Sequence, residues 1–260
     1  MPEYVEIRME ADRINKSKGK KYKFVRNHPG HRSGDIQVPL DEFTLEAESR
    51  GKELKITFKD VNTNQTISYM FGMGMSGGFA YGPADDPHPK NARVTIYGSG
   101  ANNTNLYLVD RRNFAFWKLG TWKEDRSPDI LREGVDWWNK IKTNINKKLF
   151  NKPIYEVMMD QRYFNGIGNY LRAEILGRID SNPFVSARDY IAKNEPELIK
   201  VTSTFIAKTL NYKKQMGLNY NNKEPYLKFY KKGNSIEDKG KRTFWYNPKW
   251  ESNVKEMLKS

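Results

Sequence analysis

The sequence predicts an α+β protein of two modest domains, with strands in the first half, helices in the second and strands again near the end. Three observations support this prediction. Apolar residues alternate with period two through much of residues 43–110, four helical patterns follow residue 129, and 260 residues suffice to bury a substantial core. We place the domain boundaries at 1–125 and 126–215, and assign 216–260 to the second domain.

The first domain is expected to begin with a helix at residues 5–16 and a Lys-rich stretch at 16–24. In "FTLEAESRGKELKITF", Phe43, Leu45 and Ala47 are matched by Leu54, Ile56 and Phe58 across "SRGK". This pattern predicts a β-hairpin with Lys52 at or beside its tip. Further strands are expected at 66–73, 92–98 and 105–110, and the Pro- and Asp-containing stretch 84–91 is expected to be a loop.

The second domain is expected to be helical. Helical patterns occupy residues 130–145, 152–164, 169–179 and 195–215, and strand-like character returns at 226–246. The second and third patterns are separated only by "NGIG", which is too short for anything but a tight turn. This helix, two turns, helix arrangement is suited to holding a DNA backbone, because two glycines leave backbone N–H groups accessible to a phosphate.

Charge indicates the class of partner. Lys and Arg outnumber Asp and Glu by 45 to 31, giving a net charge of +14, so a polyanion, most commonly nucleic acid, is the expected partner. No apolar run is long enough to span a bilayer, and no signal peptide precedes the start. We therefore expect a soluble intracellular protein, nuclear or wherever the genome is, that does not bind membranes.

The absence of cysteine excludes disulfides, thiolate catalysis and cysteine-ligated zinc. The three histidines, His28, His31 and His88, all lie in the first third of the chain. The C-terminal part therefore has no soft metal ligand. We expect neither a zinc ion nor any other cofactor.

The opening "MPE" contains a candidate nucleophile. If Met1 is removed, Pro2 becomes a secondary amine that could form a Schiff base, with Glu3 beside it as a proton shuttle. An α-amino group titrates near pH ~8, so a modest fraction is the free base at neutrality. The alternative is an ordinary start, with a proline in the first turn of a helix and an acid favoured by the helix dipole.

Several motifs occur together in one order: "MPE", "GKEL", "GMSGG", "VDRRNF" and "DQRYFNGIGNYLRAEIL". This set resembles the formamidopyrimidine-DNA glycosylase and endonuclease VIII family. "KRTFWYNPK" is similar to the zincless finger of the vertebrate endonuclease VIII-like proteins, which keeps the β-hairpin of a zinc finger without its metal ligands. The resemblance implies an N-terminal β-sandwich with flanking helices and a C-terminal domain carrying a helix-two-turn-helix and a zincless-finger hairpin.

The resemblance also implies catalytic roles. Pro2 would attack C1′ of the damaged nucleotide, and Glu3 would protonate the opening sugar and move protons. Lys52 would contact DNA phosphate and support catalysis, although a solvated hairpin lysine is the alternative. Glu6 and Glu174 match acidic family positions. The alternative for Glu6 is a charge at the N-terminal end of a helix, and the alternative for Glu174 is an ion pair on a helix surface.

DNA contacts follow from the same resemblance. Met75, Arg112 and Phe114 would fill the void left by the flipped nucleotide, whereas core packing is the alternative for Met75 and Phe114, and Met73 competes with Met75. Asn169 would either cap the second helix or bind a phosphate. Arg242 of the finger would bind phosphates flanking the lesion.

The sequence thus predicts a monomeric, bifunctional DNA glycosylase and AP lyase that acts on damaged DNA, duplex or single-stranded, during base-excision repair. Oxidised pyrimidines are expected to be preferred because the branch resembled is the endonuclease VIII-like one. Residues 215–225 are the candidate for lesion selection. A non-catalytic protein that binds damaged DNA or junctions is the alternative, and a small-molecule tautomerase is disfavoured by length and charge.

Overall fold

The predicted hairpin is formed by β2 (Phe43–Arg50) and β3 (Glu53–Asp60) of the computed structural model, which describes residues 2–85, 87–216 and 225–257. Leu45 lies opposite Phe58 and Ala47 opposite Ile56, whereas Phe43 lies opposite Asp60 and Leu54 opposite Ser49, so the two sets of apolar residues are offset by one pair. The turn contains only Gly51 and Lys52, and Gly51 has a φ of 58°, a left-handed conformation that favours glycine.

Eight strands within the described residues form one sheet in the order β5-β7-β6-β1-β2-β3-β4-β8. A single pair, Tyr22 with Phe43, joins β1 to β2, and it separates two four-stranded halves. The remaining strands are β1 (Tyr22–Asn27), β4 (Thr66–Gly72), β5 (Gly77–Pro83), β6 (Ala92–Gly98), β7 (Thr104–Asp110) and β8 (Phe116–Leu119). The sequence analysis did not single out β1, β5 or β8.

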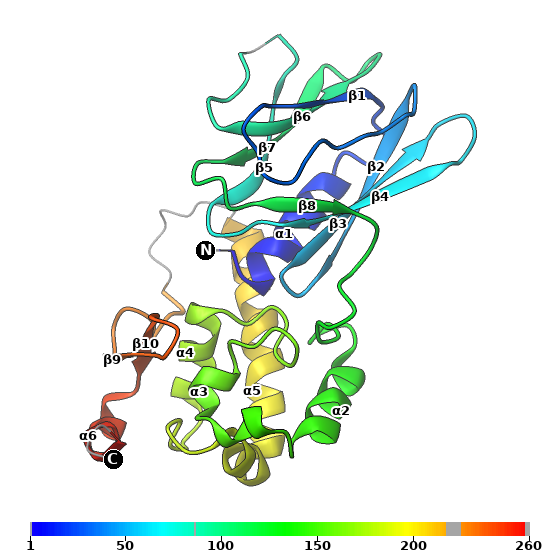
Figure 1. Cartoon of the computed structure of the whole chain (residues 1–260). Helices are drawn as coiled ribbons and strands as arrows, with labels where there is room; N and C mark the ends of the chain where they lie inside the picture. Colours follow the sequence, from blue (N-terminus) through cyan, green and yellow to red (C-terminus); the bar gives the residue numbers. More distant parts are fainter. Residues whose placement is uncertain (1, 86, 217–224, 258–260) are drawn as a thin grey trace. The chain divides into compact units, whose positions relative to one another are not determined.

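Both halves of the sheet contribute to one apolar core. Ile56 and Phe58 come from one half, Ile96 and Leu108 from the other, and all four are almost completely buried. Helix α1 (Tyr4–Asn15) adds Ile7, Ala11 and Ile14 to the same core, and it lies beside the sheet in Figure 1. This arrangement confirms the predicted N-terminal β-sandwich.

The chain divides into two compact units. The first contains Pro2 and Glu6–Lys123, and the second contains Glu3–Val5 and Glu124–Ser260. The helices of the second unit are α2 (Gly134–Asn144), η1 (Lys148–Asn151), α3 (Ile154–Val157), α4 (Asn169–Arg178), α5 (Ala187–Met216), η2 (Pro248–Trp250) and α6 (Glu251–Met257). Of these, α5 packs against both α3 and α4.

The helix expected at 152–164 is much shorter in the structure, because α3 is a single turn. Asp160 explains the ending. Its carboxylate accepts a hydrogen bond from Arg162 N at 3.0 Å and pairs with the Arg162 guanidinium, a local side-chain to backbone bond that competes with helix. The chain then passes through turns to Gly168 and begins α4 at the predicted Asn169.

A two-stranded hairpin follows near the C-terminus. It consists of β9 (Asn234–Glu237) and β10 (Thr243–Tyr246), with Phe244 opposite Ile236. Residues of β10 contact α4, and Figure 1 shows the hairpin beside that helix. The predicted strand-like region therefore contains a hairpin whose tip carries Asp238–Arg242.

Candidate functional site

Glu3 is buried, with 1% of its surface exposed, while the adjacent Pro2 is partly exposed. The Glu3 carboxylate accepts hydrogen bonds from the backbone N–H groups of Gly168 at 2.8 Å, Tyr170 at 2.9 Å and Leu171 at 3.1 Å. These donors belong to the start of α4, whose unpaired N–H groups and dipole complement a negative charge. A residue far away in the sequence thus caps this helix.

The two glycines of "NGIG" serve this arrangement rather than an open phosphate site. A Cβ atom on Gly168 would lie 2.3 Å from Glu3 Cδ, so only glycine leaves room for the carboxylate. Gly166 has a φ of 105°, its N–H donates to Gln161 Oε1 at 3.0 Å, and its carbonyl accepts from Tyr4 N at 2.9 Å. The expectation of accessible N–H groups was therefore wrong, because both groups are used within the protein.

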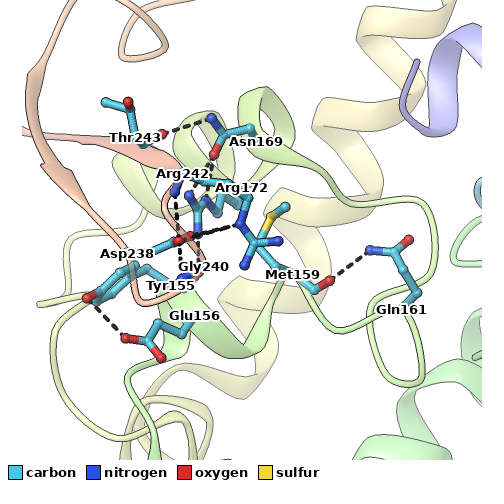
Figure 2. Close-up of polar contacts among 10 residues, drawn as sticks. All are labelled: Tyr155, Glu156, Met159, Gln161, Asn169, Arg172, Asp238, Gly240, Arg242 and Thr243. Carbon is cyan, nitrogen blue, oxygen red and sulfur yellow. Dashed lines mark hydrogen bonds and ion pairs between the residues drawn. The ribbon is translucent and has the colours of Figure 1, made fainter. Parts of the chain in front are cut away.

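Asn169 does not cap α4, because Gly168 occupies the N-cap position and Asn169 is the first helical residue. Its side chain is instead held from two sides (Figure 2). Its Oδ1 accepts hydrogen bonds from Arg172 Nε at 3.0 Å and Nη2 at 2.6 Å, and its Nδ2 donates to Thr243 O at 2.8 Å. Because a guanidinium can only donate, the amide oxygen must face Arg172. Asn169 therefore links α4 to β10, and one of the two Nδ2 hydrogens is left for another acceptor.

Asp238 is the centre of the hairpin tip. Its carboxylate is completely buried and pairs with Arg172, also completely buried, at 2.8 Å. It accepts further hydrogen bonds from Gly240 N at 2.8 Å and Arg242 N at 3.0 Å, and its Oδ2 lies 3.2 Å from Arg242 Nε. Burial opposes ionisation of Asp238, but the Arg172 and Arg242 hydrogen bonds and charges hold its pKa below the usual range.

Aromatic rings surround this ion pair. Phe244 stacks on Tyr155 with ring centroids 4.8 Å apart, and the Arg172 guanidinium lies 5.1 Å from the Phe244 centroid. Trp245 contacts Tyr230 edge to face at 4.7 Å. Stacking of this kind adds to the stability that apolar burial provides, so these contacts fasten the hairpin to α3, to α4 and to the segment that precedes it in the chain.

Arg242 borders an open pocket of about 360 Å³. Its side chain is 43% exposed although its Nε contacts Asp238. Side chains of both signs surround the pocket, and its lining consists of Leu149, Lys152, Glu156, Met159, Asp160, Asp238, Lys239, Gly240 and Arg242. A guanidinium that is fixed at one end and exposed at the other is a suitable phosphate ligand.

No protein-family model matches the chain. Endonuclease 8-like 1 of Mus musculus is 35% identical over 196 residues, covering 72% of this chain and 50% of that protein. The Homo sapiens protein of the same name is 36% identical over 167 residues, covering 61% and 43% respectively. Formamidopyrimidine-DNA glycosylase of Corynebacterium aurimucosum is 28% identical over 144 residues, 53% of this chain and 48% of that protein.

In sequence the chain is thus similar to proteins of the formamidopyrimidine-DNA glycosylase and endonuclease VIII family. It spans about half the length of the curated relatives it matches. The fold agrees with the wild-type Lactococcus lactis Fpg (MutM), which was solved in complex with DNA containing an oxidised pyrimidine. The TM-score is 0.76 at 18% identity, over 95% of this chain and 98% of that chain.

Two other residues that the family resemblance singles out lie in the first unit. Lys52 occupies the two-residue turn between Arg50 and Glu53, as predicted, and is partly buried. Glu6 belongs to the first turn of α1 and has only 3% of its surface exposed.

Glu174, another acidic residue that the resemblance singles out, anchors residues 228–230, which lead into the β9-β10 hairpin. It is completely buried, and its carboxylate accepts hydrogen bonds from the N–H groups of Lys228, Phe229 and Tyr230 at 2.7 to 3.0 Å, as well as from the guanidinium of Arg178. A helix-surface pair was therefore the wrong interpretation, because the carboxylate is not on the surface.

The residues that the resemblance assigns to void filling are exposed. Met75 and Phe114 have 40% and 38% of their surfaces exposed, and the Arg112 guanidinium lies 4.7 Å from the Phe114 ring centroid. Met73 has only 2% exposed and belongs to the core. Of the two methionines, Met75 is therefore the one with an accessible side chain.

Sequence reasoning assigned no role to Arg172 or Asp238. The signal available for Arg172 was a cation inside the apolar helical run "YLRAEIL", since a guanidinium is rarely buried without a partner. Asp238 offered no comparable signal, because "IEDKGK" reads as a charged turn. Only the fold brings the two residues together.

Other expectations concern metals, membranes and lesion selection. The described residues contain no group of three or more His, Asp or Glu side chains arranged to hold a metal ion. None of the helices in the described ranges has the length and apolar character needed to cross a membrane. Most of the segment 215–225 assigned to lesion selection, residues 217–224, lies outside the described residues.

Proposed function

We propose that the protein is a bifunctional DNA glycosylase and AP lyase of base-excision repair that removes oxidised bases through a Schiff base on Pro2. The observation that carries this proposal is the fixed carboxylate of Glu3, the residue covalently attached to Pro2. Three N–H groups hold it in a water-poor environment at the start of α4. Similarity to proteins of the formamidopyrimidine-DNA glycosylase and endonuclease VIII family supports the same chemistry.

In the first step a bond from the Pro2 nitrogen to C1′ replaces the bond from C1′ to the base. With Met1 removed, the Pro2 nitrogen attacks C1′, the bond from C1′ to the base breaks, and the base leaves after taking up a proton. Opening of the sugar ring produces an iminium between Pro2 and C1′, with a proton delivered to the ring oxygen. Glu3 is the proposed group that moves these protons.

Strand cleavage then follows from the same intermediate. The iminium acidifies the hydrogen on C2′, whose removal expels the 3′ phosphate by β-elimination. A second elimination expels the 5′ phosphate, and hydrolysis returns Pro2 as the free amine. Glu6, buried in the first turn of α1, is proposed to assist proton transfer, and Lys52 is proposed to bind phosphate from its hairpin turn.

Damaged DNA, duplex or single-stranded, is the proposed partner, which implies that the protein works where the genome is. A net charge of +14 favours such a polyanion. Arg242 and the remaining Nδ2 hydrogen of Asn169 are the proposed phosphate ligands of the second unit. Held by Asp238 and Arg172 without a metal ion, the β9-β10 hairpin would act as a zincless finger, and α3, the turns after it and α4 as a helix-two-turn-helix.

The damaged nucleotide must leave the helix to reach Pro2, at a cost of about a few kcal/mol. Met75, Arg112 and Phe114 are proposed to enter the resulting void, the first as a flexible apolar wedge, the second as a donor to base edges and the third as a stacking ring. We propose oxidised pyrimidines as the main substrates, because the chain is 35% and 36% identical to two endonuclease 8-like 1 proteins.

Borohydride trapping on DNA with one abasic site tests the proposal. Protein that begins at Pro2, verified by N-terminal mass spectrometry, should give a stable covalent adduct. The matched control is the same protein with Met1 retained, which should bind the DNA yet form no adduct because its Pro2 nitrogen is an amide. Equal trapping of both forms would refute the Pro2 mechanism, and binding without trapping in either form would favour a non-catalytic damage binder.

A further inference from the structure

Asp110, the last residue of β7, is completely buried although it is charged. Its Oδ1 accepts from the Ser76 hydroxyl and from Arg112 N at 3.1 Å, and its Oδ2 accepts from Ala115 N at 2.6 Å. Burial opposes ionisation, but the hydrogen bonds from Ala115, Ser76, Arg112 and Phe114 outweigh it and lower the pKa of Asp110. One carboxylate thus holds the turn at residues 110–115 in shape.

Ser76 extends this hold to a second loop. Its Oγ also accepts from Arg112 N at 3.2 Å, so the hydroxyl bridges the loop that carries Met75 and the turn that carries Arg112. The two backbones touch nearby. Gly74 has a φ of 56°, and a Cβ atom placed on it would lie 2.5 Å from Phe114 O. The loop that carries Met75 and the turn that carries Arg112 are therefore packed tightly against each other.

A third segment supports the same turn from the other side. Arg32 donates to Phe114 O at 3.1 Å, and Asn113 Nδ2 donates to Gly30 O at 3.0 Å. Asn113 itself has a φ of 57°, a left-handed conformation that asparagine tolerates better than most residues. With the backbone fixed in this way, the side chains of Met75, Arg111, Arg112 and Phe114 remain exposed on the two loops.

We propose that Asp110 and Ser76 are positioning residues that lock the two loops into one rigid wedge before DNA is bound. The inference rests on the proposed function of Met75, Arg112 and Phe114. Ordering a free loop on binding costs conformational entropy that must be subtracted from the binding energy. A prelocked wedge avoids this loss, and the benefit should be greatest where an intact base has to be displaced.

The test compares Ser76→Ala with Ser76→Thr, which keeps the hydroxyl. Ser68→Ala is the matched control, because it removes a hydroxyl that bonds Thr57 Oγ1 at 2.9 Å in the same sheet but touches neither loop. Each protein is assayed on duplexes carrying one thymine glycol or one preformed abasic site. A third duplex carries aminopurine opposite an abasic-site analogue, and its fluorescence at saturating protein reports unstacking by the wedge.

We expect Ser76→Ala to lower thymine glycol excision about tenfold while abasic-site cleavage changes by less than about twofold. Its aminopurine signal should fall well below that of the wild type, and Ser76→Thr should recover most of both losses. Asp110→Asn, which turns an amide donor toward Ala115 N–H, should act in the same direction if it folds. Ser68→Ala should match the wild type.

Equal loss on both substrates, or an unchanged aminopurine signal in Ser76→Ala, would overturn the lock. These outcomes differ from failure of the proposed function itself, because in that case the wild type would excise no base and unstack no aminopurine. The folded state of every variant is checked by its urea unfolding curve.

Discussion

Replacing Asp238 with asparagine should destabilise the second unit strongly although almost no volume changes. In Asp238→Asn, Oδ1 can still accept from Gly240 N and Arg242 N. The Oδ2 position becomes an amino group that faces Arg172 Nη1, 2.8 Å away in the native protein. Arg172 is completely buried, so its charge loses its counterion in a place that water does not reach.

The size of the effect follows from what Arg172 keeps. Breaking a buried ion pair by removing one partner typically costs about 3–5 kcal/mol. Arg172 retains Asn169 Oδ1 and the Tyr155 carbonyl at 2.9 Å, so we expect a loss of about 3 kcal/mol. The variant should still fold, since native proteins are typically stable by about 5–15 kcal/mol.

Urea unfolding followed by tryptophan fluorescence measures this loss, and hydrogen exchange at the Gly240 and Arg242 amides shows whether the hairpin opens first. The matched control is Lys142→Gln, which removes an exposed ion pair to Glu195 at 3.6 Å in the same unit and should cost less than about 1 kcal/mol.

A second variant separates loss of the charge pair from a general disturbance. Arg172→Met combined with Asp238→Asn should be less destabilised than the sum of the single variants, because no unpaired charge remains. A loss below about 1 kcal/mol in Asp238→Asn, or strict additivity in the double variant, would refute the reasoning.

Three further predictions concern DNA binding, the hairpin and pH. The logarithm of the DNA-binding constant should fall linearly with the logarithm of the salt concentration, with a slope of about 0.9 per phosphate neutralised. Lys52→Ala should make this slope shallower, and Lys59→Ala, at an exposed position, should change it less. Binding that does not depend on salt would contradict a DNA partner. Arg242→Ala should reduce base excision more than cleavage at a preformed abasic site, and chelators should leave both rates unchanged; the opposite result in either assay would contradict the zincless-finger proposal. Burial lowers the pKa of His28 and of His31, so the unfolded state binds protons first and the free energy of unfolding should decline as pH falls below about 6.5. Urea titrations at several pH values should show that the free energy of unfolding declines less steeply with falling pH in the double variant His28→Gln with His31→Gln. An unchanged pH dependence would contradict the assignment of this decline to the two histidines.

Alternation of apolar residues allowed the central hairpin and the buried face of its two strands to be predicted. Phe43, Leu45 and Ala47 face inward because a strand has period two. The pattern did not determine the register, since the chain turns at Gly51 and Lys52 and Phe43 lies opposite Asp60. The start of α4 at Asn169 was predicted for a similar local reason, since the glycine before it ends the preceding turn. Both features depend on neighbours in the sequence.

Two other features were missed, one for a local reason and one because it depends on distant residues. The pattern at 152–164 looks helical throughout, yet Asp160 closes a turn after α3 has made a single turn. Glu3 was assigned to proton transfer, and nothing near it in the sequence indicated that its carboxylate would cap α4. Because the contacts of Glu3 join residues more than a hundred positions apart, no local pattern encodes them.

The cap on α4 has a consequence for the newly made polypeptide. The N–H groups that hold Glu3 lie 165 to 168 positions later in the chain, and ribosomes add about 5–20 residues per second. Roughly 8–34 s therefore pass between synthesis of Glu3 and synthesis of its partners. During this interval the nascent N-terminus lacks the groups that fix its carboxylate, so the proposed reactive amine can be exposed by removal of Met1 well before the environment proposed to make it a catalyst exists.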